Sequence, residues 1–139
     1  MNGPNPEKEN HPDYVMEAIR KDYIAEIDVW FEDGKWFLGH DSPKYEIDIH
    51  FLYSQARFLW CHAKNIKALR ELSTRGLHCF WHQNDDVALT SQGYLWTYPG
   101  KELTLKSICV KPETIENADL KKCAGICSDY IENYRFKRD

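Results

Sequence analysis

At 139 residues the chain is long enough for one domain with a substantial hydrophobic core. An apolar content of 42% and an aromatic content of 14% exclude an intrinsically disordered chain. The net charge of −4, without a basic block, argues against a nucleic-acid partner, and no apolar run approaches the roughly 18 residues that a membrane span needs.

The N-terminal residues and the cysteines indicate the cell compartment. Residues 1–11 are polar and rich in proline, so they are not a signal peptide. The cysteine count of five is odd, which favours reduced thiols and a cytoplasmic location. We expect one domain over 1–139, with an N-terminal loop over 1–11 and a tail over 132–139.

In the first half of the chain, apolar spacing and turn residues predict one helix and a pair of extended segments. Proline suits a first helical turn, and an Asp-Gly pair favours a turn between strands. The expected elements are a helix over Pro12–Lys21, a strand over Ile24–Phe31, a turn at Asp33-Gly34 and an extended run over Lys35–Leu38.

The second half is predicted to alternate strands with short connections. Asn65 has the side chain of a helix cap, and Gly76 is typical of a helix stop. The polar segment 84–93 has turn character, and residues 129–138 form a final helix or a tail. The expected elements are strands over Phe58–His62, Leu77–His82, Tyr94–Thr97, Ser107–Val110 and Gly125–Ser128, and a helix over Ile66–Thr74.

This alternation is typical of a parallel α/β arrangement. Polar side chains follow each strand in turn, and in a parallel barrel such positions meet at the carboxyl rim, where active sites lie. The sequence therefore predicts a compact or incomplete TIM-type barrel with about six core strands and short helices. The polar residues are Asp28, His62, Lys64, His82, Gln83, Asn84, Thr97, Lys111 and Asp129.

Two carboxylates two positions apart, Glu26 and Asp28, point to the same face of the strand predicted over Ile24–Phe31. Such a pair is either solvated or built to hold a cation. Aromatic and aliphatic neighbours make the region look buried, and buried paired carboxylates need a metal ion or a cationic partner. His40 follows in a Gly-His-Asp sequence, either as a loop residue or as a titratable acid or base.

These segments resemble the core motif of the glycerophosphodiester phosphodiesterases, which belong to the phospholipase-C-like phosphodiesterases with a TIM-barrel fold. The central match is Glu26-Ile27-Asp28-Val29 followed by Asp33-Gly34 and His40-Asp41. Further segments resemble that family in the same order, namely Pro6–Asn10, Trp96-Thr97 and Gly125–Tyr130.

The resemblance implies a divalent metal ion, Mg²⁺ or Ca²⁺, on Glu26 and Asp28, with His40 as a catalytic acid or base. Lys64 matches a lysine that contacts phosphate in the family. His62 stands where the family has a third carboxylate ligand, and it is a metal ligand, a phosphate contact or neither. We also expect Trp96 and Asp129 to contact the substrate.

One family feature is absent from the sequence: the His-Arg-Gly that ends the first strand and supplies a second catalytic histidine. We therefore expect either a minimal barrel without that strand or a truncated reading of a longer gene, and an open barrel edge would favour a homodimer. The expected function is metal-dependent hydrolysis of a small phosphodiester, impaired by the missing motif. The alternatives are a non-catalytic barrel that binds a phosphorylated small molecule and a fragment without function.

Structural zinc is the other metal hypothesis for this chain. Cys61, His62, Cys79 and His82 lie within 22 residues of sequence, but their spacings match no Cys-x-x-Cys ligand pair. Alternation along a strand would also point Cys61 and His62 to opposite faces. The sequence therefore favours the carboxylate site over a zinc site.

Overall fold

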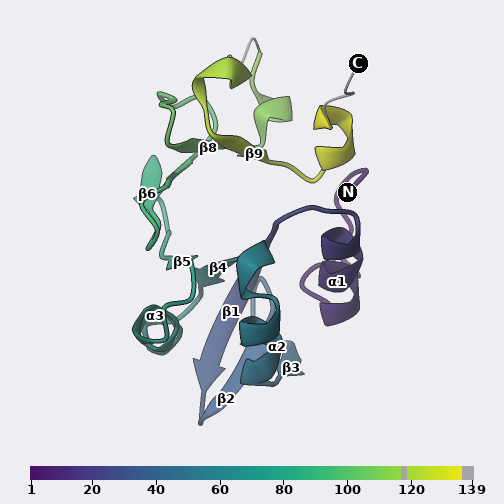
Figure 1. The fold of residues 1–139 in the computed structure, drawn as a ribbon, viewed down its shortest axis with the longest axis vertical. Coiled ribbons are helices and arrows are strands. Elements are labelled where there is room, and N and C mark those ends of the chain that lie inside the picture. Colours follow the sequence, from purple (N-terminus) through teal and green to yellow (C-terminus); the bar gives the residue numbers. More distant parts are fainter. Residues whose placement is uncertain (117–118, 136–139) are drawn as a thin grey trace.

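The structure is a computed structural model that describes residues 1–116 and 119–135. It contains two mixed β-sheets, one of five strands and one of four, and three α-helices within the described residues. Figure 1 shows the first sheet in the lower part of the view and the second in the upper part, with β5 leading into β6 between them. The predicted TIM-type parallel barrel is therefore wrong, because neither sheet is all-parallel and the strands of the described residues close no barrel.

The first sheet has the strand order β3-β2-β1-β4-β5. β1 pairs in parallel with β4, which pairs in parallel with β5, whereas β1·β2 and β2·β3 are antiparallel. The strands are β1 (Ala25–Glu32), β2 (Lys35–Leu38), β3 (Tyr45–Ile47), β4 (Leu59–Ala63) and β5 (Cys79–Phe80).

The second sheet has the order β6-β7-β8-β9. β6 is antiparallel to β7, and the two remaining pairs are parallel. The strands are β6 (Val87–Leu89), β7 (Leu95–Thr97), β8 (Ser107–Val110) and β9 (Gly125–Cys127).

Short turns explain why the sheets are mixed. Asp33 and Gly34 both have positive φ, 52° and 76°, which is the backbone of a two-residue hairpin loop and returns the chain antiparallel to β1. A parallel partner would have needed a crossover of a dozen residues or more. The sequence analysis identified this turn but still placed every strand in a parallel barrel. The prediction of a homodimer assumed an open barrel edge. Because the protein is not a barrel, that reason for expecting a homodimer no longer applies.

The helices lie at α1 (Pro12–Arg20), α2 (Ile49–Ser54) and α3 (Ile66–Thr74). Asn65 caps α3 as predicted, since its Oδ1 accepts a hydrogen bond from the N–H of Ala68 at 2.9 Å. The same side chain bonds both the N–H and the carbonyl of Phe31, at 3.3 and 3.0 Å, and so ties the helix to the end of β1. Short 3₁₀ turns complete the elements, at Ala56–Phe58, Pro112–Thr114, Leu120–Lys122 and Ile131–Tyr134.

The sequence prediction missed three elements, namely β3, α2 and β6. β6 lies inside the segment that we interpreted as polar turn, and its Val87 and Leu89 are exposed. At the end of the chain, the predicted helix or tail over 129–138 contains one 3₁₀ turn over Ile131–Tyr134, and residues 136–139 lie outside the described part. No helix in the described ranges is long and apolar enough to cross a membrane.

The main hydrophobic core lies between the first sheet and the helices. Ile27, Val29, Cys61 and Ala63, which alternate with the polar face of β1 and β4, are at most 1% exposed. They belong to one cluster with Leu52 of α2 and with residues of α1 and α3, which pack on this face. A second cluster gathers around Phe80 and Trp96. The opposite face of β1 and β4 carries Glu26, Asp28 and His62, and its Trp60 packs against this second cluster.

The start of the chain contacts its end. The N–H of Gly3 donates to the carbonyl of Asp129 at 2.8 Å, and Lys21 pairs with Glu132 at 3.1 Å. Figure 1 accordingly shows the N-terminus and the 3₁₀ turn over Ile131–Tyr134, in yellow, on the same side of the molecule. Between these contacts with the end of the chain, Asn10 reaches Asp28 of β1 through two hydrogen bonds.

Gly39 begins the loop that carries His40, and its lack of a side chain is a steric requirement. A Cβ atom there would lie 1.9 Å from the carbonyl oxygen of Ser42. The loop is fixed by two hydrogen bonds, from the N–H of Gly39 to the carbonyl of Asp28 at 3.1 Å and from Trp30 Nε1 to the carbonyl of Gly39 at 2.7 Å.

We therefore expect Gly39→Ala to lower the free energy of unfolding by about 2 kcal/mol or more, because backbone must move to admit the methyl group. Urea denaturation measures the change. Gly34→Ala is the matched control, since a Cβ at Gly34 meets nothing within 4 Å and only its positive φ is strained. Equal stability of the Gly39→Ala and Gly34→Ala variants would contradict the steric account.

Candidate metal centre

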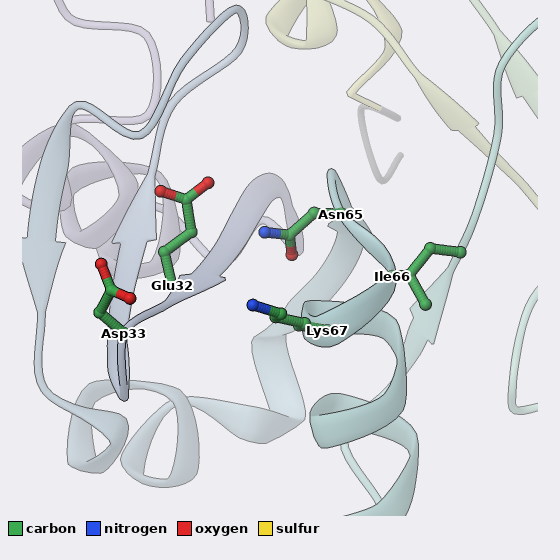
Figure 2. A pocket seen from close by; sticks show the side chains of 5 residues that line it. All are labelled: Glu32, Asp33, Asn65, Ile66 and Lys67. Carbon is green, nitrogen blue, oxygen red and sulfur yellow. The ribbon is translucent and has the colours of Figure 1, made fainter.

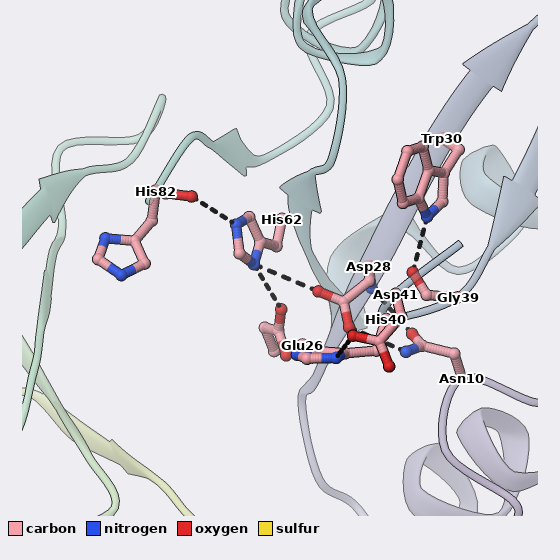
Figure 3. A network of polar contacts seen from close by, with 9 residues as sticks. All are labelled: Asn10, Glu26, Asp28, Trp30, Gly39, His40, Asp41, His62 and His82. Carbon is pink, nitrogen blue, oxygen red and sulfur yellow. Dashed lines mark hydrogen bonds and ion pairs between the residues drawn. The ribbon is translucent and has the colours of Figure 1, made fainter. Parts of the chain in front are cut away.

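The parallel register of β1 and β4 places Asp28 directly beside His62. Glu26 lies two residues earlier on β1 and faces the same side. His62 Nδ1 is 3.2 Å from Asp28 Oδ1 and 3.6 Å from Glu26 Oε1. Figure 3 marks both contacts with dashed lines. The side chains are 14%, 6% and 25% exposed for His62, Asp28 and Glu26. The structure thus brings Glu26 and Asp28, the metal ligands that the resemblance implies, together with His62, for which a ligand role was one of three alternatives.

Asn10 holds the second oxygen of Asp28. Its Nδ2 donates to Asp28 Oδ2 at 2.9 Å, and its Oδ1 accepts from the backbone N–H of Asp28 at 2.8 Å. Sequence reasoning did not assign Asn10 to the site, although it lies in the Pro6–Asn10 segment that carried part of the resemblance. That segment was the available signal for it.

The contact of the second ring nitrogen of His62, Nε2, determines which ring nitrogen carries a proton. His62 Nε2 is 3.3 Å from the carbonyl oxygen of His82, which can only accept a hydrogen bond, so Nε2 carries a proton. The ring stacks on Phe80, with centroids 5.0 Å apart, which fixes its plane. Nδ1 therefore faces the two carboxylates either as a second N–H donor or as a free lone pair.

The titration of the three groups reflects their burial and mutual contact. Burial and then the neighbouring Asp28 raise the pKa of Glu26 to about 7. Burial also opposes ionisation of Asp28, but hydrogen bonds from His62 and Asn10 outweigh it and lower the pKa of that carboxyl. Burial would lower the pKa of His62, but its hydrogen bonds to Asp28 and Glu26 raise it to about 9. Without a bound ion, protonated His62 is the positive charge in direct contact with both carboxylates.

His40 lies on the other side of Asp28. One ligand atom each from Glu9, Asp28 and His40 lie within 4.8 Å of one another, so the loop after β2 reaches the same carboxylate. His40 itself is exposed, and its Nδ1 is 2.9 Å from Asp41 Oδ1. Asp28 is therefore shared between this group and the group that it forms with Glu26 and His62.

A small pocket of about 130 Å³ adjoins the centre at the carboxyl ends of β4 and β5. Lys64 and His82 contribute to its wall. Burial and then the charge of His62 lower the pKa of His82, and His82 Nδ1 is buried without a hydrogen-bond partner. The ring of His82 stacks on Tyr98 at 3.7 Å, which fixes this wall. The lining residues are His62, Ala63, Lys64, Trp81, His82 and Gln83.

The two predicted substrate contacts lie apart from the centre. Trp96 is 6% exposed and packs against Phe80 and Trp60 in the second core cluster. Asp129 is exposed just after β9, where its carbonyl accepts the hydrogen bond from Gly3. Neither side chain belongs to the groups of possible ligands around Asp28. Their contact with a substrate therefore remains a prediction.

A larger hollow, of about 320 Å³, lies away from the centre and is shown in Figure 2. It is formed where β1 ends and α3 begins. Its charged side chains are of both signs, and Asn65 is already used to cap α3. It therefore offers no concentrated charge for a ligand. Its lining residues are Glu32, Asp33, Asn65, Ile66 and Lys67.

The residues around Asp28 fit a divalent ion. Ligand atoms that share one ion at about 2.1 Å lie roughly 3.0–3.4 Å apart, which is close to the contacts of His62 Nδ1 with Asp28 and Glu26. The bond from His62 Nε2 to the carbonyl of His82 is the outer contact that metal-ligating histidines usually make. Within the described residues, neither candidate group of ligands includes a cysteine. The centre is therefore of the carboxylate and histidine type.

Comparisons with protein-family models, with curated proteins and with solved structures found no match to this chain. The function is therefore argued from the site and from the sequence resemblance alone.

The charge state of His62 predicts how stability depends on pH in metal-free protein. Because the folded state raises the pKa of His62 from 6.5 to about 9, its contribution is complete below pH 6.5 and is lost as the pH rises through 9. We expect the free energy of unfolding to fall by about 2 kcal/mol between pH 7 and pH 9. Urea denaturation in chelator at constant ionic strength measures this fall.

Two variants test whether His62 causes this decrease in the free energy of unfolding. Glu26→Gln removes one charged partner of His62 and should make the fall smaller, whereas His50→Gln, on the exposed start of α2, should leave it unchanged. Stability that is constant or rises from pH 7 to pH 9 in the parent would show that His62 does not carry the compensating charge.

Proposed function

We propose that the protein is a metal-dependent hydrolase of small phosphodiesters, of the glycerophosphodiester phosphodiesterase type. The observation that carries the proposal is the pairing of Glu26 and Asp28 against His62 Nδ1 on the polar face of β1 and β4. Burying two carboxylates together is costly unless a cation compensates them. The positions of His40 and Lys64 beside this centre support hydrolysis of a phosphate ester.

Glu26, Asp28 and His62 are the residues that would hold the ion. A bound divalent ion supplies charge that stabilises the phosphoryl oxygens as a phosphodiester is cleaved. Lys64, in the wall of the adjoining pocket, adds a second positive charge on the substrate side. Its charge slightly lowers the pKa values of Glu26, Asp28 and His82.

His40 is the proposed proton donor to the leaving alcohol. Its Nδ1 is engaged with Asp41, so Nε2 is the atom that would transfer the proton. Asp41 keeps the ring in one orientation, since the hydrogen bond on one ring nitrogen sets the role of the other. The exposure of His40 agrees with a role toward a substrate that arrives from solvent.

Metal binding tests the first half of the proposal. We expect Mg²⁺ and Mn²⁺ to bind with one site per chain, and Asp28→Asn to weaken binding at least about 100-fold because a direct ligand loses its charge. Asp13→Asn, an exposed carboxylate in the first turn of α1, is the matched control and should bind like the parent. Calorimetric titration gives both results, and equal affinities for the parent and Asp28→Asn would rule out the centre.

Turnover tests the second half. We expect metal-dependent hydrolysis of glycerophosphocholine or a chromogenic phosphodiester, and a fall of about 10²–10⁴-fold in kcat for His40→Gln. His50→Gln should keep the parent's rate. Hydrolysis that survives His40→Gln would show that the proton donor is assigned wrongly. Binding of metal and phosphodiester without turnover in the parent would favour the alternative, a non-catalytic module for a phosphorylated small molecule.

A further inference from the structure

We propose that Asn10 determines which ion the centre takes, by holding Asp28 as a ligand with one available oxygen and so disfavouring Ca²⁺ relative to smaller ions such as Mn²⁺. The inference rests on the proposed metal centre and adds to it a selectivity and the residue that sets it.

The two hydrogen bonds between Asn10 and Asp28 together determine the orientation of the Asn10 side-chain amide. The backbone N–H of Asp28 is a donor, so the side-chain atom of Asn10 that contacts it must be the carbonyl oxygen. The amide nitrogen then necessarily faces Asp28 Oδ2, to which it donates at 2.9 Å. A flipped amide would lose both bonds, so Asn10 has one stable orientation.

The backbone around Asn10 is also fixed. Asn10 has a left-handed conformation with φ 62°, which asparagine tolerates better than most residues, and it is 8% exposed. Before it, the N–H groups of Lys8 and Glu9 both bond the carbonyl of Asn5. After it, His11 caps α1 by accepting a hydrogen bond from the N–H of Asp13. The amide is therefore held against Asp28 by structure on both sides.

The two hydrogen bonds with Asn10 limit the number of Asp28 oxygens that can bind an ion. Oδ2 is engaged by Asn10, and Oδ1 is the oxygen that faces His62. Rotation of the carboxyl group to present both oxygens would break the bond from the amide. Asp28 is thus a ligand through Oδ1 alone, beside Glu26 and one imidazole nitrogen.

Such a donor set suits small ions better than calcium. Ca²⁺ takes six to eight oxygen ligands at about 2.3–2.6 Å and commonly uses carboxylates through both oxygens. Zn²⁺ takes four ligands and binds imidazole well, and Mn²⁺, although it prefers oxygen ligands, takes only about six of them. The sequence resemblance implies Mg²⁺ or Ca²⁺. For this chain, the donor set favours Mn²⁺ or Zn²⁺ over Ca²⁺.

The test compares the affinities of Mn²⁺ and Ca²⁺ by calorimetric titration of the full chain. In the parent we expect Mn²⁺ to bind at least about 100-fold more tightly than Ca²⁺. Asn10→Gly accepts the left-handed backbone but frees Oδ2, and the ratio should fall by about tenfold as Mn²⁺ weakens and Ca²⁺ does not. Asp22→Gly is the matched control, because Asp22 also has a positive φ, 66°, but is exposed at the end of α1.

A second variant covers the case in which Asn10→Gly folds poorly. Asn10→Asp keeps the acceptor for the N–H of Asp28 and loses the donor to Oδ2, so it should also shift the preference toward Ca²⁺. Equal weakening of both ions in these variants, with the ratio unchanged, would overturn the selectivity role and leave the centre intact. Failure of every ion to bind the parent would overturn the proposed function together with this inference.

Discussion

The structure depends on one electrostatic constraint, the burial of the Glu26 and Asp28 carboxylates side by side. Two like charges in a protein interior are unfavourable unless hydrogen bonds and a positive charge offset them. Here His62 faces both carboxylates, and Asn10 satisfies the second oxygen of Asp28. The raised pKa of Glu26, about 7, shows that this compensation is incomplete for the outer carboxylate. An additional cation would complete it, and that is the physical reason to interpret the cluster as a metal centre.

The fold serves this centre through contacts that converge on Asp28. The parallel register with β4 supplies His62, the segment before α1 supplies Asn10, and the loop after β2 is bonded to the carbonyl of Asp28 through Gly39. The opposite face of the same strands is packed against the helices, with Ile27 and Val29 almost fully buried. A strand anchored this firmly on one face can carry an unfavourable pair of charges on the other, because core packing outweighs the local cost.

The sequence was sufficient to predict the local elements that depend on neighbouring residues. Alternation along the strand put Glu26 and Asp28 on one face, and the Asn65 cap and the Asp33-Gly34 turn followed from their own side chains and backbone preferences. The antiparallel pairing of β1 and β2 is equally local, since the Asp33-Gly34 turn determines it, whereas the parallel pairing of β1 with β4 depends on contacts between segments far apart in the sequence. Asn10 was missed for that reason, since its bonds to Asp28 span 18 residues. Trp96 was expected at a substrate surface but packs on Phe80, and aromatic character alone does not distinguish these two positions.

The protonation of His62 tests the central claim most directly, because a bound ion must replace the proton on Nδ1. Long-range proton–nitrogen NMR of the ¹⁵N-labelled protein at pH 7.5 reports both ring nitrogens, first in chelator and then with one equivalent of Zn²⁺, which is diamagnetic. The account predicts protons on both nitrogens without metal, and loss of the Nδ1 proton with retention of the Nε2 proton when the ion is added. A ring that keeps both protons in the presence of metal, or that is neutral before metal is added, would contradict it.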